Sequence, residues 1–137
     1  MPPQPIQNTS QTSPLPRRGK EYDPWEHAKA LGLQVISRPI RTANELWLPE
    51  YFTIVIKSGM RHVHQRAALA HGIGHAEMGH CDDRPKHERQ ADTYASTHLI
   101  SQHELDDLTR WTDDLGTIST ELGVTRRLLD VYLLRLG

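Results

Sequence analysis

Two pairs of potential metal ligands stand out in this sequence, each with a spacing of four residues. His71 and His75 lie in a segment predicted to be helical. At about 100° per residue their imidazoles project from one face, about one turn apart. Two such nitrogens can occupy neighbouring corners of a zinc tetrahedron. Glu88 and Asp92 repeat the spacing on the next predicted helix. Glu88 can supply a third ligand, and Asp92 can accept the outer N–H of a ligating histidine. Three ligands with an open fourth position are typical of a catalytic zinc site.

The composition agrees with a metal site in a small intracellular protein. The chain has 137 residues and nine histidines, most of which lie between His62 and His98. Its formal net charge of -1 argues against an electrostatically driven nucleic-acid binder, so no direct contact with nucleic acid is expected. No apolar run approaches the roughly 20 residues of a membrane span, so no membrane contact is expected either. The single cysteine, Cys81, cannot form an internal disulfide, which is typical of a cytoplasmic protein.

The elements that must position these side chains are predicted from periodicity and turn residues. Residues 1–20 are rich in proline and are predicted to form a disordered tail. Residues 21–100 are predicted to form the core, and residues 101–137 a C-terminal helical segment of the same domain. We therefore expect an α+β fold with a small, mostly antiparallel sheet against the two metal-bearing helices. A cleft is expected between an edge strand near residues 52–57 and the His71 helix, so that a substrate strand can extend the sheet.

The two metal-bearing segments resemble the ImmA/IrrE family of small zinc metallopeptidases. RAALAHGIGHAEMGH and HERQADTYASTHLIS are similar to that family's AHELGH helix followed by an ExxAxxFAxxLL helix. The matching positions are Leu69, Ala70, His71, Gly74, His75 and His80, then Glu88, Ala91, Tyr94, Ala95 and Leu99. The resemblance implies a minimal zincin-like fold and one Zn²⁺ held by His71, His75 and Glu88. It also implies a protein substrate or partner, namely a helix-turn-helix repressor of phage, mobile-element or stress regulation.

One position departs from the family pattern. The HExxH motif has a glutamate directly after its first histidine, and this chain has Gly72 there. That glutamate takes a proton from water and passes it to the leaving amine, so Gly72 marks the position of a missing general base. Losing a general base typically costs about 10²–10⁴ in rate. Glu77 lies about 240° further around the helix and is expected to be solvated. We expect a hole at Gly72 that a glutamate at this position would fill.

Three hypotheses follow from this pattern. The first is a zinc-dependent endopeptidase that cleaves a repressor, with catalysis impaired by Gly72. The second is a non-catalytic zinc-binding antirepressor or sensor that binds its partner without cutting it. The third is a structural domain in which zinc holds two helices together. His64 and His98 are further candidates for the lining of the cleft.

Overall fold

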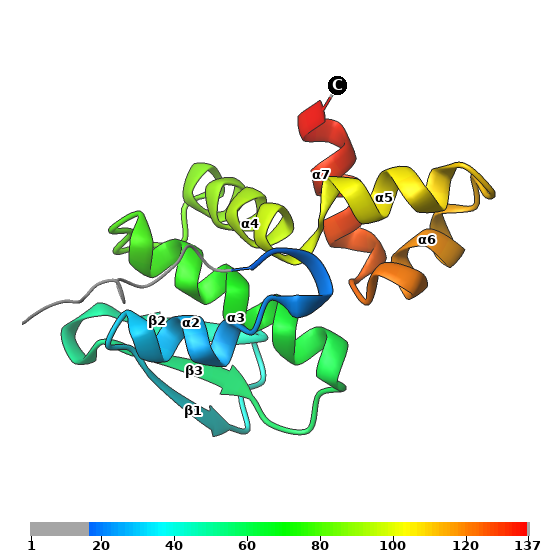
Figure 1. The fold of residues 1–137 in the computed structure, drawn as a ribbon. Helices are drawn as coiled ribbons and strands as arrows, with labels where there is room; N and C mark the ends of the chain where they lie inside the picture. The colour runs from blue at the N-terminus through cyan, green and yellow to red at the C-terminus, as the bar shows by residue number, and fades with distance from the viewer. Residues whose placement is uncertain (1–16, 137) are drawn as a thin grey trace, which may run out of the picture.

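The computed structural model describes residues 17–136, in which six α-helices accompany a three-stranded sheet. Figure 1 shows helix α3 between two layers, with the sheet and α2 on one side and α4 on the other. Helices α5 to α7 pack beside this arrangement at the C-terminal end of the chain (Figure 1). The expected α+β class is confirmed. No helix in the described part of the chain is long and apolar enough to cross a membrane.

The sheet is mixed rather than mostly antiparallel. Strand β3 (Thr53–Lys57) lies in the centre, parallel to β1 (Gln34–Arg38) and antiparallel to β2 (Glu45–Leu48). The short 3-10 turn η2 (Pro49–Tyr51) joins β2 and β3 as neighbours, whereas the segment after β1 carries the chain to the opposite edge. Because β3 is central, the expectation of an edge strand at residues 52–57 is wrong. The strand edges belong to β1 and β2.

The two helices predicted to carry the metal ligands are present, and caps and glycines mark the ends of several helices. Helix α2 (Pro24–Ala30) is capped by Asp23, whose carboxylate accepts hydrogen bonds from the backbone N–H groups of Trp25 and Glu26. Gly79, with φ +68°, follows the end of α3 in a left-handed conformation that glycine adopts readily. The remaining helices are α3 (His62–Glu77), α4 (Pro85–Leu99), α5 (Gln102–Thr109), α6 (Leu115–Leu122) and α7 (Arg126–Leu136).

Two hydrophobic clusters meet at α3. Leu69 and Ile73 pack with Ile54 and Ile56 of the sheet, and all four side chains are buried. Ala70, on another face of the same helix, belongs to the cluster formed by α4 and the C-terminal helices. Helix α3 is therefore held from both sides, which fixes the direction in which its remaining face points.

The N-terminal segment joins the fold earlier than expected. Residues 1–16 lie outside the described part of the chain, but the last residues of the tail predicted for residues 1–20 pack against the fold. Gly19 is buried in the 3-10 turn η1 (Gly19–Glu21), and its carbonyl accepts a hydrogen bond from Arg66. Arg18 donates a hydrogen bond to the carbonyl of Thr97. These backbone contacts were not visible in a composition dominated by proline.

Candidate metal centre and cleft

Four of the predicted site residues line a pocket of about 480 Å³, namely His64, His71, Glu88 and Asp92, and His75 lines a neighbouring one. The walls of the larger pocket come from the loop before β2, from α3 and α4, and from the start of α7. A second pocket of about 290 Å³ shares Ala43, Glu45 and Glu88 with the first. The two pockets therefore run past the same carboxylates along edge strand β2. The cleft follows β2 and not, as expected, a strand at residues 52–57.

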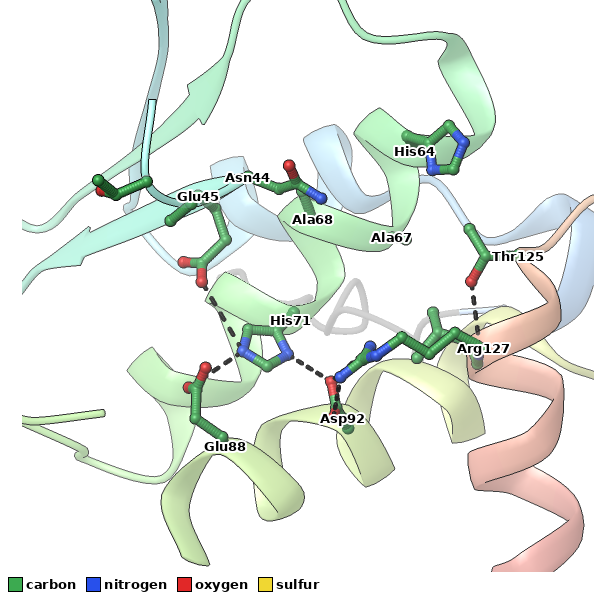
Figure 2. A pocket seen from close by; sticks show the side chains of 13 residues that line it. Asn44, Glu45, His64, Ala67, Ala68, His71, Glu88, Asp92, Thr125 and Arg127 are labelled. Atoms are coloured by element: carbon green, nitrogen blue, oxygen red, sulfur yellow. Dashed lines mark hydrogen bonds and ion pairs between the residues drawn. The ribbon is translucent and has the colours of Figure 1, made fainter. Parts of the chain in front are cut away.

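The three predicted ligands converge where the two pockets adjoin. The Nε2 atoms of His71 and His75 lie 3.1 Å apart, one helical turn from each other on α3. Glu88 Oε2, from α4, lies 3.3 Å from His71 Nε2 and 2.5 Å from His75 Nε2. Figure 2 shows Glu88 approaching His71 from α4, on the side opposite to β2.

Asp92 fixes the tautomer of His71. Its Oδ1 lies 2.8 Å from His71 Nδ1, so Nδ1–H donates and the lone pair of Nε2 faces the pocket. Arg127, from α7, pairs with the same carboxylate (Figure 2). Burial would raise the pKa of Asp92, but the hydrogen bonds from His71 and Arg127 hold it below its usual range. Burial would also lower the pKa of His71, but Asp92, Glu45 and Glu88 together raise it.

His80 fixes the tautomer of His75 in the same way. His80 is buried, and its Nε2–H donates to Gln90 Oε1 at 2.9 Å, which leaves its Nδ1 as an acceptor. His75 Nδ1 lies 2.9 Å from that atom and therefore donates to it. The lone pair of His75 Nε2 is left facing the pocket. His80 is thus a buried, hydrogen-bonded histidine whose contacts orient His75.

The donor set fits a metal ion. Two imidazole nitrogens lie 3.1 Å apart beside at least one carboxylate oxygen, and these are atom types that bind a metal cation such as zinc. Burial and the neighbouring His71 lower the pKa of His75, which favours the neutral ring that a metal ligand needs.

A fourth side chain, Glu45 of β2, enters the site and was not predicted from the sequence. Its Oε1 lies 3.7 Å from His71 Nε2, and it reaches His71 from β2 in Figure 2. One ligand atom each from Glu45, His71 and His75 lie within 4.8 Å of one another, so Glu45 is itself a potential ligand. Burial raises the pKa of Glu45 to about 7; His71 opposes the rise, and Glu88 and Asp92 add to it.

The sequence does contain a signal for Glu45. Successive side chains of a strand alternate between its two faces, so that Glu45 shares a face with Trp47. Trp47 packs against the sheet cluster, and its indole N–H donates to the carbonyl of His80. A glutamate on the covered face of a strand is uncommon and indicates a site. Arg127 has no such signal, because it faces solvent over most of its length.

The expected hole at Gly72 is absent. A Cβ atom at this position would lie 2.8 Å from Ile54 Cγ2 and 3.2 Å from Glu45 Oε2. Both distances are shorter than ordinary van der Waals contact, so two neighbouring side chains already fill the space. The expectation of an empty space that a glutamate could enter freely is therefore wrong.

The other candidate residues are placed as follows. His64 lines the larger pocket, away from the cluster around His71 (Figure 2). His98 does not line either pocket but packs against Tyr22, His27 and Tyr94 on the far side of α4. Ten residues after Glu88, it lies about 15 Å further along the helix axis, which takes it past the cleft. Glu77 is exposed, as expected.

An α+β fold with two histidines of one helix and carboxylates of neighbouring elements in one cleft defines a metallopeptidase-like domain. Comparison with family models agrees with this class: residues 28–133 match the family of M78 peptidases, described as the IrrE N-terminal-like domain. The match covers most of the chain, which therefore belongs to the IrrE N-terminal-like family. Peptidases of this family are metal-dependent. The comparison with curated proteins finds no match.

Proposed function

We propose that this chain is a zinc-dependent endopeptidase of ImmA/IrrE type that cleaves a helix-turn-helix repressor. The observation that carries this proposal is the convergence of His71 Nε2, His75 Nε2 and Glu88 Oε2 inside an open cleft. These three side chains are the proposed zinc ligands, and Asp92 positions the first of them. Family membership and the resemblance of the two motif helices support the choice of metal and of partner.

The roles of the protein side chains follow from their contacts. Bound zinc supplies Lewis-acid chemistry, polarising a carbonyl and making water a better nucleophile. Asp92 and His80 hold protons at the Nδ1 atoms of His71 and His75, which keeps both Nε2 atoms available as donors. Arg127 neutralises Asp92 and keeps its carboxylate in place. The ligand geometry is thus prepared before any substrate arrives.

Edge strand β2 supports binding of an extended polypeptide. In the described sheet β2 pairs with β3 along one edge, and its other edge borders both pockets. Leu46 is 42% exposed and points away from the buried face. A protein segment that adds to this edge would run past Glu45 and Glu88, since both pockets share these residues. A flexible segment of a repressor fits this geometry.

Metal content provides the first test of the proposal. We expect about one zinc per chain in protein purified without chelator, measured by elemental analysis. His71→Ala, His75→Ala and Glu88→Ala should each reduce the zinc content to near zero, because two remaining ligands hold zinc weakly. The matched control is His64→Ala, a histidine of the same helix and pocket that lies outside the cluster; it should keep wild-type zinc content.

Cleavage is tested with a helix-turn-helix repressor, chosen from the genes that neighbour the one for this chain where they encode one. The two proteins are co-expressed, and intact mass spectrometry is used to detect two fragments whose masses sum to that of the repressor plus one water. The fragments should be absent with His71→Ala and when zinc is removed. Zinc-dependent binding of an intact repressor would instead support the antirepressor function, which the absence of a carboxylate on residue 72 favours.

A further inference from the structure

A buried carboxylate on β2 faces the turn of α3 that lacks one. The Glu45 side chain is only 12% exposed, and its Oε1 lies 3.7 Å from His71 Nε2. Its Oε2 is buried and has no hydrogen-bond partner among residues 17–136. An unpaired carboxylate oxygen inside a protein destabilises the fold, so support of the fold does not explain this side chain.

Gly72 is the residue that admits this carboxylate. The nearest polar atom to a Cβ at position 72 would be Glu45 Oε2, at 3.2 Å. The Glu45 carboxylate therefore lies against the helix where a side chain at residue 72 would begin. It also borders His71, the first histidine of the HGIGH segment. In the family pattern, a glutamate at the position of residue 72 supplies a carboxylate at this place.

Glu88 lies closer than Glu45 to the two histidines. Glu88 Oε2 contacts the Nε2 atoms of both histidines, at 3.3 and 2.5 Å. Glu45 contacts only His71, at the longer distance of 3.7 Å. The two histidines and Glu88 thus form the tighter set of three, and the Glu45 carboxylate lies beside that set with one oxygen free of hydrogen bonds in the described structure.

We propose that Glu45 is the catalytic carboxylate of this chain and acts from β2 on the atoms that a glutamate at residue 72 would reach from α3. The proposal rests on the peptidase function proposed above. Glu45 accepts one proton from water while the water oxygen bonds to the peptide carbonyl carbon. Glu45 then returns this proton to the amide nitrogen as the C–N bond breaks. The products are a carboxylic acid and an amine, and Glu45 is again ionised.

Zinc content and inhibitor affinity test the position of Glu45 without relying on activity. The variant is Glu45→Gln, which keeps the shape of the side chain but cannot accept a proton. Glu77→Gln is the matched control, because it removes an exposed carboxylate of the helix that carries His71. Both variants should bind one zinc with an affinity within about threefold of wild type. A loss of zinc from Glu45→Gln alone would make Glu45 a ligand and overturn the proposal.

The inhibitor used is acetohydroxamate, which gives up a proton when it chelates zinc. Calorimetry on the zinc-loaded proteins should show at least tenfold weaker binding to Glu45→Gln than to wild type, because the acceptor of this proton is missing. Glu77→Gln should bind as wild type does. Equal affinities for wild type and Glu45→Gln would show that the carboxylate does not reach the bound molecule, which overturns the proposal.

Repressor cleavage then separates this proposal from the proposed function. Glu45→Gln should cleave at least about 100-fold more slowly than wild type, in keeping with loss of a general base. Wild-type rates in Glu45→Gln would overturn the role of Glu45 and leave the peptidase function intact. A wild-type chain that binds zinc but leaves the repressor whole would overturn the peptidase function itself.

A double variant moves the carboxylate back to the helix. In Glu45→Ala/Gly72→Glu, the space near Gly72 is relieved of one of its two occupants. Cleavage should rise at least tenfold over Glu45→Ala, provided that circular dichroism and zinc content show a folded site. Gly72→Glu alone should give no gain over wild type, because Glu45 already lies there. A gain of tenfold or more in that single variant would contradict the proposal.

Discussion

Two histidines and a glutamine form one hydrogen-bonded series, and only His75 of this series faces the metal site. His75 Nδ1–H donates to His80 Nδ1, and His80 Nε2–H donates to Gln90 Oε1. These two hydrogen bonds fix the tautomer of both rings. The same effect on His71 comes from a carboxylate, Asp92. An uncharged and a charged acceptor thus orient two ligands of one site, and the uncharged one is the weaker support.

Replacing His80 should weaken metal binding without removing a ligand. In His80→Ala the Nδ1–H of His75 loses its acceptor, and the ring is free to turn or change tautomer. Zinc affinity should fall by about 10- to 100-fold, measured by competition with a chromophoric chelator. The control is His87→Ala, which removes a ring stacked on His80 at 4.0 Å but not hydrogen-bonded to it. An equal loss in both variants would contradict a role in orienting His75.

At the level of single residues, the sequence predicts what helix geometry determines. His71 and His75 lie on one face because a spacing of four residues in a helix requires it, and Glu88 and Asp92 follow the same rule. The approach of Glu45 to His71 depends on the packing of a strand against a helix, which no spacing encodes. The filled space at Gly72 is a consequence of the same packing.

At the level of elements, strand order was the part of the fold that local patterns could not determine. A strand near residues 52–57 was predicted and is present as β3, and η2 makes β2 its neighbour. Strand β1 could pair with either β2 or β3. The choice depends on the path of the segment between β1 and β2 across the sheet, which local patterns do not encode. The helices were predicted more closely, since caps and glycines mark their ends within the sequence itself.

Helices α2 and α4 meet through two stacked histidines, which makes their contact sensitive to acid. His27 and His98 have ring centroids 5.5 Å apart, and burial lowers the pKa of both. The unfolded chain therefore binds more protons than the folded one just below pH 6.5. The free energy of unfolding should decrease as the pH falls from 7.5 to 5.5.

The variant His98→Phe keeps a ring in the stack but cannot be protonated. In urea titrations at pH 7.5 and 5.5, it should lose less stability than wild type over this interval. His103→Ala serves as the control, because the His103 side chain is 85% exposed and should leave the wild-type difference unchanged. If His98→Phe loses as much free energy of unfolding as wild type between pH 7.5 and 5.5, other residues cause the acid sensitivity.

At the level of the whole molecule, one buried arginine joins three segments. Arg66 of α3 donates to the carbonyls of Gly19 and Tyr22 and to that of Gly123, which follows α6. The α+β class and the C-terminal helices were predictable from periodicity, but this junction was not. It depends on backbone carbonyls, which every residue carries, and so leaves no mark on the sequence.

Arg66→Met should therefore destabilise the whole domain. The methionine fills part of the space, but three carbonyls lose a charged donor, which should lower the free energy of unfolding by about 3 kcal/mol. Urea unfolding followed by circular dichroism measures this change. Arg110→Met, a change on an arginine that is 78% exposed, should cost no more than about 0.5 kcal/mol. Similar losses for both variants would show that Arg66 does not join the segments.

The crowding at Gly72 also restricts the evolutionary routes that lead to this chain. A side chain at residue 72 competes with Ile54 and with the Glu45 carboxylate for the same volume, at 2.8 and 3.2 Å. A chain with glutamate at both positions is crowded and brings two acidic groups together, whereas a chain with neither has no carboxylate there. If the two positions change one at a time, the chain passes through one of these two unfavourable intermediates. Positions 45 and 72 should therefore have changed together, and each should constrain the other in present-day sequences.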